Sequence, residues 1–405
     1  LLDVKGKLIA GSDNIKLGTF NGDYDFSKVR KIAASDGAEY DQFGYSVDTD
    51  GIHAIVGAFG SPNNAHQGKA YIFNIVTGNQ LHILTASDAA DSDNFGHSVA
   101  VSGNYAIVGA WGNDDNGSDS GSAYIFSVTT GNQLHKLLSG APNATRYFGY
   151  SVDIAGNYAI VGAYRDPVDG SNETGSAYIF DVTTGNQLHK LTASDAVVWD
   201  YFGYSVGIDG NYAIVGAYGK DESGTNNNAG TAYIFNVTSG AELHKLFPQD
   251  RGGSDYFGES VAISGNYAII GVKNNDAPHE GSDSGSAYIF DVTTGVEYRK
   301  LMGNDLTTND YFGCDVDICG NYAIVGAKGD DDHGTDSGAA YIFDIRTGEQ
   351  LHKLTKGHTV AGTRDFGQAV SIGGQYVIAG THWHKVGIRE SVTYDIGAAY
   401  IFGPK

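Results

Sequence analysis

Hydrophobic residues along the chain occur in short runs that polar and glycine-containing segments separate. A representative stretch has four such runs, at residues 148–154 (FGYSVDI), 157–163 (NYAIVGA), 175–182 (GSAYIFDV) and 186–191 (NQLHKL). Each run is rich in β-branched and aromatic residues and is bounded by Gly, Asn, Asp or Thr, which is typical of a β-strand. Gly-Asn joins the first two runs and Thr-Thr-Gly-Asn joins the last two, as in tight hairpins. The pattern predicts four short antiparallel strands and no helix.

This four-strand unit recurs seven times along the chain. The pair Phe-Gly opens each unit and begins at residues 43, 95, 148, 202, 257, 312 and 366. The triplet Tyr-Ile-Phe lies in the third strand and begins at residues 71, 124, 178, 233, 288, 341 and 400. The Phe-Gly pairs are spaced by 52–55 residues, and a four-stranded repeat of about this length is typical of a propeller blade. We therefore predict an all-β, seven-bladed β-propeller with four antiparallel strands per blade.

The two ends of the sequence predict how the ring closes. The seventh unit lacks a fourth strand, because only residues 403–405 follow its Tyr-Ile-Phe triplet. Near the other end, residues 29–44 match residues 81–96 position for position. We expect residues 26–33 to form the outer strand of blade 7, so that the propeller comprises residues 26–405. Residues 1–25 are then an N-terminal extension, and their short alternating stretches suggest self-association by strand addition to a neighbouring subunit.

The repeat resembles a known family. Phe148-Gly149 followed by Val161-Gly162-Ala163 resembles the FG-GAP repeat, which builds the seven-bladed propeller of integrin α-subunits. The forms SGNYAIVGA and LTASDA are more similar to the FG-GAP repeats of bacterial and algal proteins. The resemblance covers residues 26–405 and implies the fold, whereas function lies in the loops that the blades carry.

The resemblance also raises the question of calcium. Calcium-binding members carry an Asp-x-Asp-x-Asp-Gly-x-x-Asp loop between the first and second strands of a repeat. Here that place holds only short turns, such as residues 155–157 and 264–266, which offer too few oxygen ligands for Ca²⁺. The resemblance therefore implies that the family's usual metal sites are missing from this chain.

Charge and composition exclude several functional classes. Asp and Glu total 47 against 25 Lys and Arg, which gives a net charge of −22 and disfavours binding to nucleic acid. No run of 18 apolar residues is present, so we expect no membrane span. Cys314 and Cys319 lie on one strand and its turn and are expected to remain free thiols. The metalloprotease, nucleophile-elbow and phosphate-loop signatures are absent, so we expect a binding protein rather than an enzyme.

A candidate ligand site comes from aligning the repeats. The residue after the second strand is aromatic in blades 1–4 and polar or basic in blades 5–7: Phe59, Trp111, Tyr164 and Tyr218, then Lys273, Lys328 and His382. The residue after Phe-Gly divides in the same way: Tyr45, His97, Tyr150 and Tyr204, then Glu259, Cys314 and Gln368. Aromatic faces beside cationic donors suit sugars or anionic glycans, so we expect a glycan or protein ligand at the mouth of the ring.

Two other interpretations of this pattern stay open. One is that the sequences of two groups of blades have drifted apart and that no ligand binds. The other is a polysaccharide lyase or hydrolase that uses acid–base residues at the mouth, for which the candidates are His97, Glu259, His382 and His384.

Acidic loops between second and third strands are the candidate metal sites. They contain Asp114, Asp115 and Asp119 in blade 2 and Asp330, Asp332 and Asp336 in blade 6. Carboxylates clustered near glycine suit Ca²⁺, which would make the protein a calcium-dependent adhesin. The alternative is that these are solvated acidic turns.

Four sequons and a set of histidines complete the candidates. The sequons are at Asn116, Asn143, Asn172 and Asn236, and glycosylation there would fit a secreted or cell-surface protein. The histidines occupy one position of the fourth strand in five blades: His82, His135, His189, His244 and His352. They lie too far apart around the rim for a shared site, so we expect them to be architectural.

Overall fold

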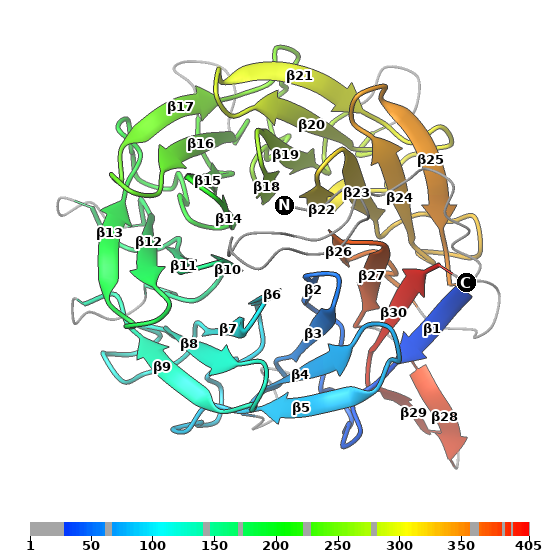
Figure 1. Ribbon diagram of the computed structural model, residues 1–405. Helices are drawn as coiled ribbons and strands as arrows, with labels where there is room; N and C mark the ends of the chain where they lie inside the picture. Colours follow the sequence, from blue (N-terminus) through cyan, green and yellow to red (C-terminus); the bar gives the residue numbers. More distant parts are fainter. Residues whose placement is uncertain are drawn as a thin grey trace, which may run out of the picture.

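Seven four-stranded antiparallel sheets stand around a central axis in the computed structural model, which confirms the predicted seven-bladed propeller (Figure 1). The structure describes residues 28–60, 67–140, 146–168, 173–221, 228–276, 282–356, 364–382, 385–389 and 392–404. Within these ranges the regular elements are all β-strands.

Each blade runs from a first strand at the axis to a fourth strand at the rim. In the order of blades 1 to 7, the first strands are β2 (Val47–Thr49), β6 (Val99–Ser102), β10 (Val152–Ala155), β14 (Val206–Asp209), β18 (Ser260–Ser264), β22 (Phe312–Cys319) and β26 (Ala369–Gly373). The second strands are β3 (His53–Ala58), β7 (Tyr105–Ala110), β11 (Tyr158–Ala163), β15 (Tyr212–Ala217), β19 (Tyr267–Val272), β23 (Tyr322–Ala327) and β27 (Tyr376–Thr381).

The outer half of each blade is equally regular. The third strands are β4 (Lys69–Asn74), β8 (Ser122–Ser127), β12 (Ser176–Asp181), β16 (Thr231–Asn236), β20 (Ser286–Asp291), β24 (Ala339–Asp344) and β30 (Ala398–Gly403). The fourth strands are β5 (Gln80–Leu84), β9 (Gln133–Leu137), β13 (Gln187–Leu191), β17 (Glu242–Leu246), β21 (Val296–Leu301), β25 (Glu349–Leu354) and β1 (Lys28–Ile32).

The Phe-Gly pair lies before the first strand rather than inside it, which corrects the predicted extent of that strand. In blade 3, β10 begins at Val152, four residues after Phe148. Gly149 has φ = +87°, and a Cβ there would lie 2.1 Å from the carbonyl oxygen of Ser122 in the preceding blade. Glycine is therefore required because the backbones of two blades meet at this turn. Blade 6 is different, since β22 begins at Phe312 itself.

The hydrophobic core lies between the blades. Phe148 is fully buried, and its ring centroid is 5.4 Å from that of Tyr178 and 5.9 Å from that of Phe180. These rings share one cluster with Ile107 and Leu137 of blade 2. Burying each such side chain contributes roughly 1.5–3 kcal/mol, so stacking of blades, rather than any single sheet, stabilises the ring.

Ring closure occurs as the sequence predicts. Strand β1 pairs antiparallel with β30, from Lys28 opposite Gly403 to Ile32 opposite Ala399. Blade 7 therefore combines strands from both ends of the chain. The expected extension at residues 1–25 lies outside the described residues.

The rim histidines connect neighbouring blades. The Nε2 atoms of His82, His135, His189 and His244 lie 2.9–3.2 Å from a threonine carbonyl oxygen of the next blade. Arg299 does the same in blade 5, where its Nε donates to the carbonyl oxygen of Ile345 at 3.0 Å. The expectation of an architectural role agrees with these contacts.

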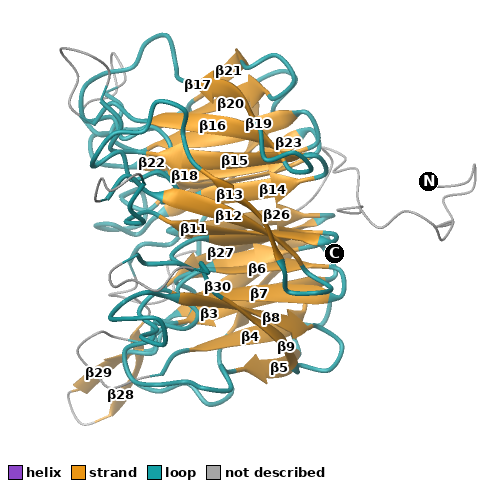
Figure 2. Cartoon of the chain, turned by 90° about the vertical axis from the view of Figure 1, so that its left-hand side faces the viewer, coloured by secondary structure: helices purple, strands orange, loops and turns teal. Residues whose placement is uncertain are grey.

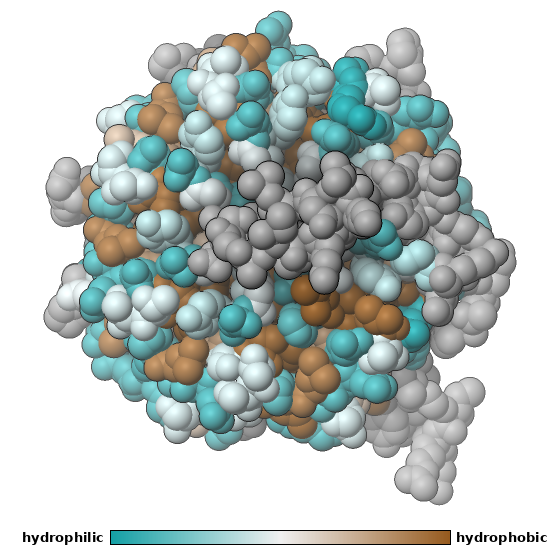
Figure 3. All heavy atoms as spheres, viewed as in Figure 1, coloured by the Kyte–Doolittle hydropathy of each residue, from teal (hydrophilic) through white to brown (hydrophobic). Residues whose placement is uncertain are grey.

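The ring has two different faces. The turn face carries the short hairpins, and Figure 3, which views it, shows hydrophilic and hydrophobic residues interspersed around the ring. The loop face carries the connections between second and third strands and between blades (Figure 2). In blade 7 this connection contains an added hairpin of β28 (Lys385–Arg389) and β29 (Val392–Asp395), which projects from the ring (Figures 1 and 2).

Candidate ligand-binding site

A cavity of about 280 Å³ lies on the axis of the ring and is lined by residues from all seven blades. The segments that lead into the first strands supply its wall, because these strands are the innermost element of every blade. The lining has three levels, which begin at the loop face. Each level is one alignment position of the repeat, so each contains one residue per blade.

The level at the mouth is here called the collar. It consists of the residue after each Phe-Gly: Tyr45, His97, Tyr150, Tyr204, Glu259, Cys314 and Gln368. The hydroxyl of Tyr150 donates to that of Tyr204 at 3.0 Å, and His97 Nδ1 lies 3.0 Å from the carbonyl oxygen of Tyr150. Burial lowers the pKa of His97 to about 4, so its ring is neutral at pH 7. The collar therefore presents an uncharged aromatic half and a polar half.

Behind the aromatic half of the collar lies a second group of rings, here called the aromatic arc. It consists of Phe59, Trp111, Tyr147, Tyr164, Tyr201 and Tyr218. The arc contacts the collar through pairs whose ring centroids are 4.5–4.6 Å apart, namely Phe59 with Tyr45, Tyr164 with Tyr150 and Tyr218 with Tyr204.

The arc is continuous from blade 2 to blade 4. Trp111 contacts Tyr147 at 4.8 Å, Tyr147 contacts Tyr164 at 5.4 Å, and Tyr201 stacks on Tyr218 at 5.2 Å with a 15° interplanar angle. Phe59 is buried, whereas the other members are half-buried and keep part of their surface exposed. The aligned aromatic residues after the second strands are thus brought together.

Two members of the arc, Tyr147 and Tyr201, were not expected from the sequence. Each of them directly precedes a Phe-Gly pair. The guanidinium of Arg165 lies 4.9 Å from the ring centroid of Tyr147 and adds a cation that sequence reasoning also missed. Its signal in the sequence is its place directly after Tyr164.

Blades 1–4 form the aromatic sector of the ring, and blades 5–7 form the polar sector. The polar sector carries less positive charge around the mouth than its sequence suggests. Lys273 forms an ion pair with the collar residue Glu259, whose carboxylate neutralises the charge of the lysine. His382 lies 5.5 Å from the ring of Tyr45, and burial together with the charge of Lys328 lowers its pKa to about 4. Lys328 itself lies over the ring of Tyr311 at 5.9 Å.

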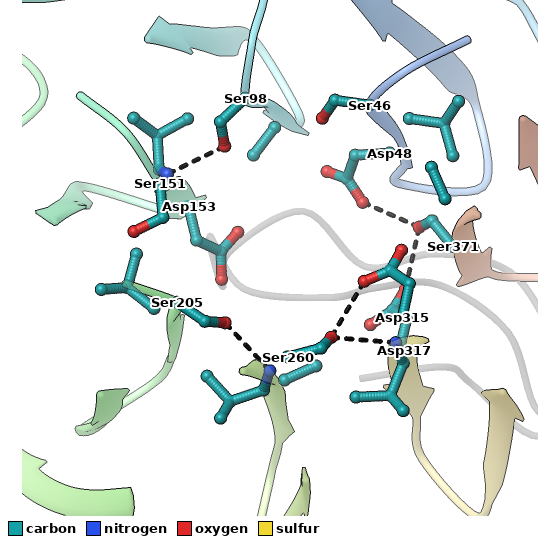
Figure 4. A pocket seen from close by; sticks show the side chains of 18 of the residues that line it. Ser46, Asp48, Ser98, Ser151, Asp153, Ser205, Ser260, Asp315, Asp317 and Ser371 are labelled. Atoms are coloured by element: carbon teal, nitrogen blue, oxygen red, sulfur yellow. Dashed lines mark hydrogen bonds between the residues drawn. The ribbon is translucent and has the colours of Figure 1, made fainter. Parts of the chain in front are cut away.

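The second level of the cavity is a ladder of serine hydroxyls between blades (Figure 4). Ser46, Ser98, Ser205 and Ser260 each accept a hydrogen bond from a valine N–H of the next first strand, at 2.9–3.1 Å. A first strand is the edge of its sheet, so its outward N–H groups have no strand to pair with. Side chains of the preceding blade satisfy them instead.

Blade 6 replaces serine by Asp315 at this level. One carboxylate oxygen accepts from Ser260 Oγ at 2.9 Å and the other from the Val370 N–H at 2.7 Å. Burial is the main cause that raises the pKa of Asp315 to about 7, and the nearby Asp317 contributes to the rise.

The third level contains more carboxylates. Asp48, Asp153 and Asp317 each accept from an N–H of the next first strand at 2.7–2.8 Å. Ser371 Oγ lies 2.8 Å from both Asp48 and Asp317 (Figure 4). Sequence reasoning missed these residues. In the sequence they are marked by polar residues one and three positions after the collar residue. The role of these positions can be recognised only when neighbouring first strands are seen side by side.

The acidic loops bind lysines and backbone N–H groups of the protein itself. Asp115 pairs with Lys136, and Asp332 pairs with Lys353 at 2.6 Å. The carboxylates of three other candidates are engaged or close to cations as well: Asp114 accepts from the Asp119 N–H, Asp330 accepts from Tyr341, and Asp336 lies 3.7 Å from Arg364. Within the described ranges, no three His, Cys, Asp or Glu side chains come together in a way that could hold a metal ion.

The remaining candidates fall in different places. Asn116 is half-buried in its loop, and Asn236 accepts two hydrogen bonds from Ser239 that close a hairpin. Asn143, Asn172 and His384 lie outside the described residues. Cys314 and Cys319 are not joined in a disulfide, and burial raises the pKa of Cys314 to about 11.

Comparison with known proteins gives one family. A model described as the FG-GAP repeat matches residues 26–73, 79–126, 132–180, 186–235, 241–290 and 296–343. Each window contains a fourth strand followed by the first three strands of the next blade. The windows stop before blade 7, the blade that carries the β28–β29 insertion. No protein of curated function matches the sequence.

The family match bears on two properties, the role of the fold and the location of the protein. FG-GAP repeats are typical of extracellular proteins, and their propeller is consistent with a binding or adhesion role. Among the described residues no helix could cross a membrane. On the strength of six matched repeats and seven observed blades, the chain belongs to the FG-GAP repeat family.

Proposed function

We propose that this protein is a non-catalytic, extracellular binding module that holds a neutral glycan at the loop-face mouth of its channel. The observation that supports the proposal is the continuous aromatic arc beside the collar. Aromatic rings offer apolar faces to the C–H surfaces of sugars, while the tyrosine hydroxyls offer donors and acceptors.

The preference for a neutral glycan comes from the charges around the mouth. Lys273 forms an ion pair with Glu259, and Arg165 lies 3.7 Å from the carboxylate of Glu173. His382 and His97 are neutral at pH 7 because burial lowers the pKa of both rings. The cavity below contains Asp48 and other carboxylates. An acidic glycan would meet this negative potential, and the net charge of −22 adds to the repulsion.

An array of neutral and acidic glycans tests the proposal. We expect binding to neutral members, with no new reducing ends after prolonged incubation. Trp111→Ala and Tyr164→Ala should each weaken binding about tenfold, which corresponds to ~1.4 kcal/mol, because each removes a ring from the arc. Tyr298→Ala, which removes an exposed ring from the rim strand β21, is the matched control and should change nothing. Equal affinity of the wild type and a folded double variant of the arc would refute the proposal.

A further inference from the structure

We infer that the glycan enters the channel end-on, so that the module recognises the terminal sugar of a chain rather than an internal segment. This inference rests on the proposed function and specifies which part of the ligand the site reads. Three properties of the cavity support it: its enclosure, its size and its chemistry.

A closed ring of blades surrounds the cavity around the channel axis. All seven blades contribute a segment to its wall, and the pairing of β1 with β30 leaves no open blade. A linear polymer that lies across the loop face can touch the arc, but its internal sugars cannot reach the second and third levels. Only a chain end can enter a pocket that is surrounded in this way.

The size of the cavity fits one sugar. Its volume of about 280 Å³ lies at the small end of ligand pockets, which span roughly 300–1,000 Å³ for drug-sized molecules. From the collar residue Tyr45 to Asp48 the chain advances three residues, or about 10 Å at ~3.3 Å per residue. A single ring can occupy this depth while the next sugars of the chain rest against the aromatic arc.

The chemistry of the levels fits a terminal sugar. The collar supplies aromatic surface through Tyr45, Tyr150 and Tyr204. Below it, the wall includes serine hydroxyls and carboxylates such as Asp315 beside apolar residues such as Ala369, and the described residues that line it include no Lys or Arg. A terminal sugar carries more hydroxyl groups than an internal one, because one of its oxygens is not used in a linkage. Hydroxyl and carboxylate oxygens are the acceptors that these donors require.

The collar residue Gln368 allows a direct test. Its side chain lines the cavity at the mouth, so Gln368→Trp would narrow the entrance. Gln67→Trp places the same ring at an exposed position of a loop on the same face and is the matched control. The probe is an array of neutral glycans attached through their reducing ends, with melting temperature as the measure of folding.

End-on entry predicts two results. Gln368→Trp should weaken array binding more than tenfold while Gln67→Trp leaves it unchanged. The methyl glycoside of the terminal sugar of the best array ligand should compete with that ligand for the wild-type protein. The competition uses no variant, so it remains decisive if Gln368→Trp fails to fold.

The opposite outcomes separate this inference from the proposed function. If a folded Gln368→Trp protein keeps its binding, or if the methyl glycoside fails to compete, end-on entry is overturned. Loss of binding in Trp111→Ala would then still support a glycan lying along the arc. If the wild type binds no neutral glycan, both proposals fail.

Discussion

The aromatic sector (blades 1–4) and the polar sector (blades 5–7) share one scaffold and differ most around the channel. In blade 3, of the aromatic sector, Phe148 is fully buried and its centroid lies 5.4 Å from Tyr178. In blade 6, of the polar sector, Phe312 is equally buried and also lies 5.4 Å from its tyrosine, Tyr341. The packing between blades is therefore alike, and it does not impose the different collar residues. What differs between the sectors is free to serve a ligand.

The sectors also respond oppositely to pH. In the aromatic sector burial lowers the pKa of His97 to about 4, and in the polar sector burial raises the pKa of Asp315 to about 7. Both groups are thus held uncharged over part of the pH range, for the same physical reason. In both sectors, therefore, burial favours the neutral form of one group that lines the channel.

The largest expected effect tests whether the scaffold is really the same. Phe148→Ala and Phe312→Ala should each lower the free energy of unfolding by about 3–5 kcal/mol, because each leaves a cavity between two blades. Denaturant unfolding of the two variants should give values within ~1 kcal/mol of each other. A larger difference would mean that the sectors differ in packing as well as in the collar.

The next effect concerns Asp315. Its folded pKa is about 7 and its unfolded value about 3.9, so the folded state holds the proton more tightly and loses this stability as the pH rises through 7. Asp315→Ser restores the residue found at this level in five other blades. Relative to the wild type, the variant should gain about 2 kcal/mol between pH 5 and pH 8. A stability difference that stays constant over this range would contradict the assignment.

His97 should show the reverse dependence. Its pKa is about 4 in the fold against ~6.5 unfolded, so its contribution is present above pH 6.5 and is lost as the pH falls towards 4. His97→Phe keeps an aromatic ring in the collar and removes the titration. Between pH 7.5 and pH 5 the variant should lose about 1–2 kcal/mol less stability than the wild type. If the melting temperatures of the two proteins change in parallel over this pH range, the effect is ruled out.

The smallest effect belongs to the rim, where the sectors use different residues for one contact. His135 in blade 2 and Arg299 in blade 5 both bond to a carbonyl oxygen of the next blade. Alanine at either position should cost about 0.5–1 kcal/mol, since each contact is a partly exposed hydrogen bond. Thermal unfolding of both variants gives the comparison. A loss several times larger at one of them would show that the rim, too, distinguishes the sectors.

The fold was largely predictable, because Phe-Gly and Tyr-Ile-Phe recur at positions that every blade requires. Residues such as Phe148 and Gly149 are fixed by contacts between neighbouring blades, so they repeat and can be counted. The start of the first strand was misplaced, since a hydrophobic run does not reveal that Gly149 turns the chain at φ = +87°.

The site was predictable only in part. The aromatic residues Trp111 and Tyr164 stand out in an alignment of the repeats, but Asp48 and Asp315 do not. These carboxylates are explained by N–H groups of another blade, more than fifty residues away in sequence. The ion pair between Lys273 and Glu259 could not be predicted from the sequence either, because it depends on where the two side chains lie at the mouth.

The joint between β1 and β30 has a consequence for the order of folding. Blades 1–6 can each form from consecutive residues, whereas blade 7 must wait for the two strands that lie farthest apart in the chain. Contacts of such long sequence separation form late, because the chain entropy between them must first be lost. Until then the third strand of blade 7 is an open edge that another chain can pair with. The joint therefore sets the time during which a newly made ring is vulnerable to exchanging strands with its neighbours.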